Sequence, residues 1–188
     1  MSSAVCPSCG RGVLTPRPSK RPILIVKDNV TQGEIEFSTI FGLTGISPFG
    51  NQENSASYYL QKEFGMAGLN MESFAMTCLH LHTPPKAKKT KADREIVQGC
   101  VDFGTKQLVE FIQPYKLILT LGSEVTKFLT GYNASTVYGL VCQSQFTPAV
   151  VVPAPNSDKI MAQPIGELRN ALKVFAEQVK ILDQYLNI

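Results

Sequence analysis

The chain has 188 residues, of which 44% are hydrophobic and 18% charged, and its formal net charge is +3. This length suffices for one domain with a core of its own, so we expect residues 1–188 to form a single domain. No apolar run reaches the length of a membrane span. The first residues also lack the charged start and apolar centre of a signal peptide. We therefore predict a cytoplasmic protein, in a bacterium or a phage-infected cell, with no membrane partner.

The elements of the first half alternate between apolar runs and polar, glycine-rich stretches. In chain order we expect a lead-in over 1–21, a strand over 23–26, a long loop over 27–50, a helix from about 52 to 64, and a strand over 73–77 that continues toward 82. The lead-in is rich in Gly, Pro and Arg and holds a Cys-x-x-Cys pair, Cys6 and Cys9. An odd total of five cysteines argues against a disulfide framework and points to metal or redox chemistry.

The second half repeats the pattern of strand and helix. Thr90 and Asp93 have the spacing of a capping box at the start of a helix that Pro114 ends. We then expect a strand over 116–121, a helix that Ser123 opens and Gly131 closes, a strand over 149–152, and a long helix from 164. Continuous apolar strands that alternate with helices predict a parallel sheet covered on both faces, an α/β fold.

Ligands of such sheets bind beyond the carboxyl ends of the strands. The polar candidates at these ends are Asp28, Asn29, Cys78, His80, Ser123 and Asn156. Each has a plainer explanation. Asp and Asn often stabilise turns, a cysteine at a strand end is often a small buried residue, and Ser123 suits a helix N-cap whose backbone N–H also faces any nearby phosphate.

Basic residues gather in two places. One cluster comprises Arg11, Arg17, Lys20 and Arg21, and the other comprises Lys86, Lys88, Lys89 and Lys91. Local patches of this kind can bind phosphate backbones although the net charge is small, or they can be ordinary solvated loops.

The stretch from Thr77 to Gly131 resembles the iron–sulfur, family-4-like branch of the uracil-DNA glycosylase superfamily. The matching segments are Thr77-Cys-Leu-His-Leu-His-Thr-Pro-Pro85, then Cys100, then Ile112-Gln-Pro-Tyr-Lys-Leu-Ile-Leu-Thr-Leu-Gly122, then Phe128-Leu-Thr-Gly131. Weaker similarity covers Cys6 and Cys9, the loop after the first strand, and Val152-Pro-Ala-Pro-Asn-Ser157.

The resemblance implies a four-stranded parallel sheet sandwiched between helices, and DNA as the partner. Its members flip a damaged base out of DNA and cleave the N-glycosidic bond. It also implies a DNA-binding groove over the strand ends, with Lys86, Lys88 and Lys89 near phosphates and Ser123 as a further DNA contact.

Several motif positions of the family hold other residues here. Asp28, followed by Asn29, replaces the glutamate of the first motif, whose two glycines are also absent. Cys78 stands where an asparagine reads the base, and Asn156 where a histidine stabilises the departing uracil. Asparagine donates a hydrogen bond but cannot become a cation, so part of the electrostatic stabilisation is lost. Phe49 corresponds to the stacking phenylalanine, or else packs in the core.

Two functions follow from these observations. In the first, the chain binds DNA and excises uracil or another modified base: Asp28 orients water or stabilises the oxocarbenium ion, Asn156 hydrogen-bonds the departing base, and Phe49 stacks on it. In the second, the chain is an inactive superfamily member that acts as a DNA-binding subunit, for example with replication or repair proteins. The replaced motif residues leave enzymatic activity open.

The resemblance also implies a metal centre. The family places two further cysteines after the second strand and on the next helix, and these positions hold His82 and Cys100, with seventeen residues between them. We therefore predict that Cys6, Cys9, His82 and Cys100 bind one metal centre that tethers residues 1–21. The family implies a [4Fe–4S] cluster, and zinc is the alternative because Cys₃His is an ordinary structural zinc set. His80 is then either a neighbour of this centre or a pocket residue.

Overall fold

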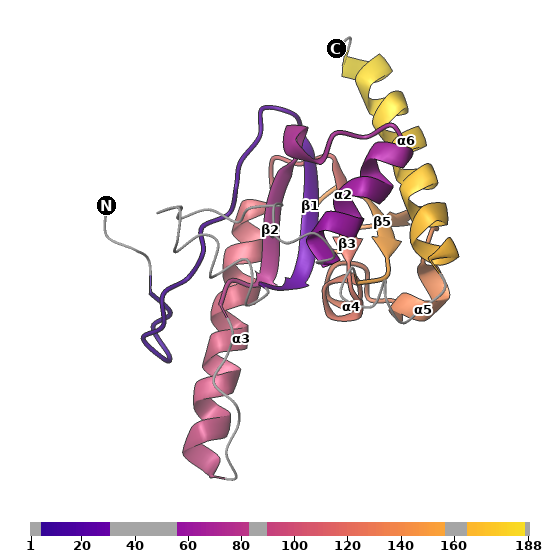
Figure 1. Ribbon diagram of the computed structural model, residues 1–188. Helices are drawn as coiled ribbons and strands as arrows, with labels where there is room; N and C mark the ends of the chain where they lie inside the picture. Colours follow the sequence, from indigo (N-terminus) through magenta and orange to yellow (C-terminus); the bar gives the residue numbers. More distant parts are fainter. Residues whose placement is uncertain (1–4, 31–55, 83–89, 157–164, 187–188) are drawn as a thin grey trace.

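The computed structural model describes residues 5–30, 56–82, 90–156 and 165–186 (Figure 1). Its elements in chain order are β1 (Ile23–Asn29), α2 (Ala56–Met66), the 3-10 helix η1 (Met71–Ser73), β2 (Ala75–His80), α3 (Lys91–Phe111), β3 (Leu117–Leu121), α4 (Ser123–Thr130), α5 (Ala134–Val137), β4 (Cys142–Gln143), β5 (Val150–Ala154) and α6 (Gly166–Leu186).

One sheet organises these elements, with the strand order β2-β1-β3-β5-β4. The first four strands in this order pair in parallel, and β4 pairs with β5 in antiparallel orientation. The predicted α/β fold with a parallel sheet between helices is confirmed. The predicted number of strands is wrong, because the described residues form five. The missed strand, β4, has only two residues, too few to produce a recognisable pattern.

Successive residues of β1 supply the two halves of the core. Ile23 and Ile25 belong to the cluster that α2 and α6 cover, whereas Leu24 and Val26 belong to the cluster that α3 and α4 cover. All four side chains are fully buried. Side chains alternate between the faces of a strand, so an apolar run without polar interruptions requires cover on both faces.

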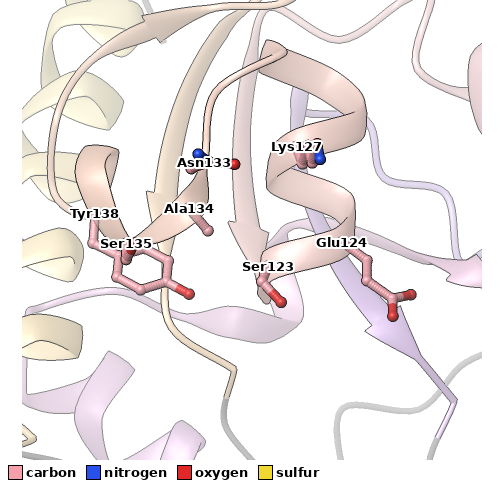
Figure 2. A pocket seen from close by; sticks show the side chains of 7 residues that line it. All are labelled: Ser123, Glu124, Lys127, Asn133, Ala134, Ser135 and Tyr138. Atoms are coloured by element: carbon pink, nitrogen blue, oxygen red, sulfur yellow. The ribbon is translucent and has the colours of Figure 1, made fainter.

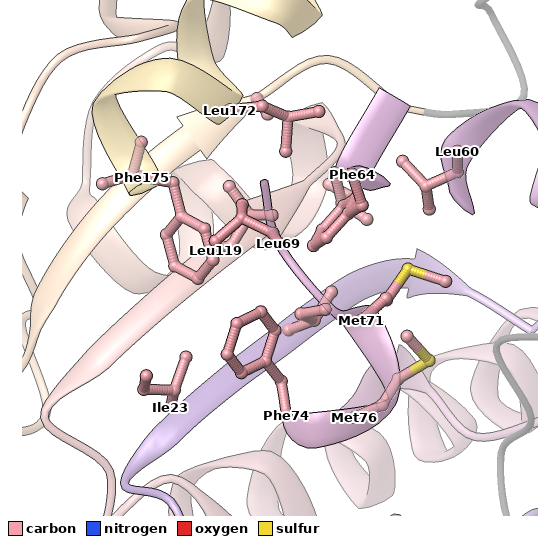
Figure 3. Packing of buried hydrophobic residues seen from close by; sticks show 14 of the residues in the cluster. Ile23, Leu60, Phe64, Leu69, Met71, Phe74, Met76, Leu119, Leu172 and Phe175 are labelled. Atoms are coloured by element: carbon pink, nitrogen blue, oxygen red, sulfur yellow. The ribbon is translucent and has the colours of Figure 1, made fainter. Parts of the chain in front are cut away.

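The larger cluster is shown in Figure 3. The rings of Phe74, which precedes β2, and Phe175 on α6 meet edge to face, with centroids 5.8 Å apart and an interplanar angle of 85°. Phe64 of α2 lies on the same side of the sheet and is fully buried. The long helix predicted from 164 is α6, and its buried residues, Leu168, Ala171, Leu172, Phe175 and Val179, pack in this cluster.

The first strand is longer than predicted. The sequence interpretation ended it at Val26 and placed Asp28 and Asn29 in a loop, but β1 continues through Asn29. Lys27 pairs with Cys78 of β2 and Leu121 of β3, and Asn29 pairs with His80. Parallel neighbours, on both sides of Lys27 and on the β2 side of Asn29, hold these polar residues in extended conformation, which hydrophobicity alone does not reveal.

Helix α3 begins as the capping box predicts, because the Thr90 side chain accepts a hydrogen bond from the backbone N–H of Asp93. Its first turns extend away from the sheet, and its second half packs against β2 (Figure 1). None of the helices that the structure describes combines the length and the apolar character needed to cross a membrane.

Candidate functional site

Four side chains from three separate parts of the chain converge at the end of β2. The Cys₃His group comprises Cys6, Cys9, His82 and Cys100, whose donor atoms all lie within 4.8 Å of one another. Cys6 Sγ is 3.7 Å from Cys100 Sγ, and Cys9 Sγ is 3.3 Å from His82 Nε2. The predicted convergence is confirmed, and this group could hold a metal ion.

The N-terminal segment reaches the Cys₃His group by running along β2. The backbone N–H of Arg17 donates to the Met76 carbonyl and the N–H of Met76 donates to the Arg17 carbonyl, each at 2.8 Å. Further along, the N–H of Leu14 donates to the Leu81 carbonyl at 2.9 Å. This pairing places the Cys-x-x-Cys turn beside the residue after Leu81, which is His82.

The turn itself is shaped for thiolate ligands. Backbone N–H groups of Ser8 and Cys9 hydrogen-bond to the Cys6 sulfur. Gly10 has a φ of 69°, which favours glycine, and its N–H donates to the Cys6 carbonyl at 2.8 Å. Gly99 of α3 lets the turn approach, because a Cβ at this position would lie 2.4 Å from Ser8 Oγ. The turn therefore packs directly against the helix that carries Cys100.

Burial shifts the pKa values of the His82 imidazole and of the Cys100 thiol. Burial, together with the positive charge of Arg11, lowers the pKa of His82, so its ring is neutral near pH 7. Neutral imidazole is the form that binds metals. Burial also raises the pKa of the Cys100 thiol to about 12. A cation in the group would oppose this effect by stabilising the thiolate.

A second set of polar residues lies at the carboxyl ends of β1, β2 and β3. Asp28 is 6% exposed, and its Oδ1 accepts the backbone N–H of Val125 at 2.8 Å. The N–H groups of Ser123 and Glu124 also hydrogen-bond to this carboxylate. Asp28 thus caps the N-terminus of α4. Its pKa is raised, mainly by burial and further by the negative charge of Glu124.

The cap explains the glycine that precedes α4. Gly122 has a φ of 131°, and a Cβ at this position would lie 2.1 Å from Asp28 Oδ2. Gly122 is the N-cap residue, so the prediction that Ser123 caps the helix is wrong; Ser123 is the first helical residue. Its backbone N–H, proposed as a phosphate contact, faces Asp28 instead.

His80 lies in the same region. Its Nε2 is 3.2 Å from Glu124 Oε2, while its buried Nδ1 has no hydrogen-bond partner among the described residues. Its backbone neighbour in the sheet is Asn29, whose side chain is exposed. His80 is two residues from His82, so the strand-end residues and the Cys₃His group form one continuous region.

An open pocket of about 470 Å³ adjoins this region (Figure 2). It lies between α4 and α5, with Ser123, Glu124 and Lys127 on one side and Asn133, Ala134, Ser135 and Tyr138 on the other. Burial raises the pKa of the Tyr138 hydroxyl, and the charge of Asp28 adds to the effect. All lining residues except Ala134 have polar side chains, and they include an acid, Glu124, and a base, Lys127.

The remaining predicted residues have different outcomes. Cys78 is 1% exposed and belongs to the core cluster under α2 and α6, as the plainer explanation predicted. Asn156 is half-buried two residues after the end of β5, at the same edge of the sheet as Asp28. Phe49, Lys86, Lys88 and Lys89 lie outside the described residues.

Two members of the N-terminal basic cluster have structural partners. The Arg17 guanidinium donates to the carbonyls of Met71 and Phe74, at 3.1 and 2.9 Å. Arg21 forms an ion pair with Asp183 of α6 and lies over the Phe74 ring. These two arginines fasten the lead-in to the core, so this cluster is a weaker candidate for phosphate binding than the lysine cluster.

Sequence reasoning missed Glu124, Lys127 and Tyr138. The position of Glu124 in the first turn after β3 was a usable signal, because that turn meets the carboxyl edge of the sheet. No sequence signal pointed to Tyr138, because it follows a four-residue helix that is too short to show a periodic pattern.

Compared with known families and with curated proteins, the sequence matches no family model and no curated protein.

Proposed function

We propose that this chain is a DNA-binding protein of the uracil-DNA glycosylase superfamily, divergent enough that excision of uracil by the usual mechanism is lost. The position of Asp28 supports the loss of uracil excision. Its carboxylate accepts backbone N–H groups at the start of α4 and is almost fully buried. A carboxylate committed in this way is poorly available to orient a water molecule.

DNA binding is supported by the concentration of positive charge in the lysine cluster. Lys86, Lys88 and Lys89 lie between His82 and Cys100 in the sequence, and both of these residues belong to the Cys₃His group. In the sequence this basic segment follows His82 and precedes the first turn of α3, which extends away from the sheet (Figure 1). Lysines of this segment would hold phosphates, and their contribution to the affinity would fall with salt.

A second candidate function is excision of a different modified base, and His80 favours it. The family's motif histidine is replaced by Asn156, but His80 supplies an imidazole at the same edge and is oriented by Glu124. In this form His80 would hydrogen-bond the departing base. In the inactive form, the chain would act as a DNA-binding subunit beside replication or repair proteins.

We expect the lysine cluster to carry most of the salt-dependent affinity for DNA. Fluorescence anisotropy with single- and double-stranded oligonucleotides, over a salt series, would compare the wild-type chain with two triple-alanine variants. The test variant replaces Lys86, Lys88 and Lys89, and the control replaces three exposed lysines elsewhere, Lys106, Lys173 and Lys180. The test variant should lose at least about tenfold in affinity at low salt. The slope of log affinity against log salt concentration should decrease in magnitude by roughly 0.7–0.9 for each phosphate contact that is lost. Equal losses in both variants would contradict the proposal.

Excision is tested separately, with oligonucleotides that contain uracil and a panel of other modified bases, followed by cleavage at abasic sites. We expect uracil to remain in place. Release of another base that is lost in His80→Gln would establish the second candidate. Release of uracil that is lost in Asp28→Asn would contradict the structural assignment of Asp28. If no base is released, DNA binding together with copurification of a polymerase would support the subunit function.

A further inference from the structure

Two distances within the Cys₃His group are close to those in the ligand shell of one ion. Zinc–sulfur bonds are about 2.3 Å and zinc–nitrogen bonds about 2.0–2.1 Å, so tetrahedral geometry separates two thiolates by ~3.8 Å and a thiolate from an imidazole nitrogen by ~3.6 Å. Cys6 Sγ and Cys100 Sγ are 3.7 Å apart, and Cys9 Sγ and His82 Nε2 are 3.3 Å apart. Both distances are close to these values.

A four-iron cluster requires a wider arrangement. Its four protein ligands bind different corners of a cube and project outward from it, so they lie farther apart than ligands that share one ion. All donor atoms of the Cys₃His group lie within 4.8 Å of one another. This spacing leaves no room for a cube of iron and sulfide between them, and the cluster that the resemblance implies does not fit.

The burial and chemistry of the donors indicate a closed structural site. Cys6, Cys100 and His82 are 0%, 1% and 4% exposed, and Cys9 is partly buried. Four protein ligands complete a tetrahedron and leave no position for water or substrate, as in structural rather than catalytic zinc sites. The nearby positive charge of Arg11 offsets the excess negative charge that three thiolates leave on a divalent ion.

We infer that the Cys₃His group binds a single Zn²⁺ ion in a closed tetrahedral site, in place of a four-iron cluster. The ion fastens the N-terminal segment to the end of β2 and to the middle of α3, three parts of the chain that are distant in sequence. Its role is structural, because binding energy at such a site stabilises the folded arrangement of its ligands. The inference concerns the metal alone and does not depend on DNA binding.

The test begins with the wild-type chain, expressed with both iron and zinc supplied and purified under anaerobic conditions. Elemental analysis should find about one zinc per chain and little iron, and the protein should be colourless. Brown protein with broad visible absorption and about four irons per chain would overturn the inference. Protein that contains neither metal, and that takes up no zinc when zinc is added, would also overturn it.

Variants then identify the ligands. Cys100→Ser and His82→Ala should each retain less than about a tenth of the wild-type zinc, since a structural site depends on its complete ligand set. Cys142→Ser is the matched control, because Cys142 is a partly buried cysteine of β4 outside the group. It should keep full zinc content. Retention of zinc by both ligand variants would contradict the assignment.

Cobalt provides a readout that does not depend on whether the ligand variants fold. The wild-type chain, freed of zinc and loaded with Co²⁺, should show the intense visible bands of a tetrahedral ion together with thiolate charge-transfer absorption in the near ultraviolet. Addition of zinc should abolish both features. The weak absorption of six-coordinate cobalt would exclude the closed tetrahedral site.

Discussion

Replacing Asp28 by alanine should lower the free energy of unfolding by about 2 kcal/mol. The Asp28 carboxylate accepts the backbone N–H of Val125 and caps the start of α4, in a buried position. Loss of an N-cap acceptor costs ~0.5–2 kcal/mol, and a buried donor left without a partner costs ~1–3 kcal/mol. The measurement is urea unfolding at pH 7 of wild-type and variant, followed by circular dichroism.

Asp28→Asn is the matched variant, because its side-chain oxygen still accepts the Val125 N–H while the charge is removed. We expect it to lose less stability than Asp28→Ala. If both variants were as stable as wild-type, the cap would contribute nothing, and a role of Asp28 in catalysis would regain support.

The difference in the free energy of unfolding between wild-type and Asp28→Asn should depend on pH. Burial raises the pKa of Asp28 in the folded chain above its unfolded value of about 3.9. The folded state then favours the protonated carboxyl, so this group stabilises the protein most below about pH 4 and loses that contribution as the pH rises through the folded pKa. Wild-type should therefore lose stability relative to Asp28→Asn between pH 4 and 7. A difference that stays constant over this range would show that the pKa is not raised.

Gly104→Ala should also lower the free energy of unfolding by about 2 kcal/mol, the usual cost of overpacking a tight interface. Gly104 is buried where α3 packs against β2, and a Cβ at this position would lie 2.3 Å from the backbone carbonyl oxygen of Leu79. A backbone atom cannot rotate away as a side chain can, so the helix must shift from the sheet. Thermal and urea unfolding would measure the loss.

The control for Gly104 is Gly65→Ala in α2. Apart from its chain neighbours and the backbone of its own helix, no heavy atom lies within 4 Å of the position where the added Cβ would be, so only helix propensity acts. Alanine is better than glycine in a helix by up to ~1 kcal/mol, and we expect a small gain in stability. Replacing glycine by alanine should thus lower the free energy of unfolding in α3 and raise it in α2. A gain at Gly104 would show that α3 does not approach β2 this closely.

The Cys₃His group could be predicted because its signal is chemical and local. Cys6 and Cys9 are spaced to reach one centre, and the resemblance located His82 and Cys100. Whether the group suits one ion or a cluster could not be predicted in this way. It depends on distances between donor atoms from three segments, and these are set by the pairing of Arg17 with Met76 and by the approach that Gly99 allows.

The strand-end residues show the opposite case. Asp28 and Ser123 were both identified as site residues, but their relation to each other was not, because it joins positions far apart in sequence. Only the packing of α4 against β1 brings the carboxylate to the helix N-terminus. The same holds for His80 and Glu124, which meet only once β2 and β3 lie on either side of β1.

By itself, the sequence determined the α/β class and the covered parallel strands, and with the resemblance it located the four residues that could hold a metal. These properties follow from apolar runs such as Ile23–Val26 and from side-chain chemistry, which are carried by neighbouring residues. Tertiary structure alone decided the extent of β1, the added strand β4, the cap that Asp28 forms and the spacing of the ligands. Each of these depends on contacts between distant segments, whose energies exceed the local preferences of polar residues.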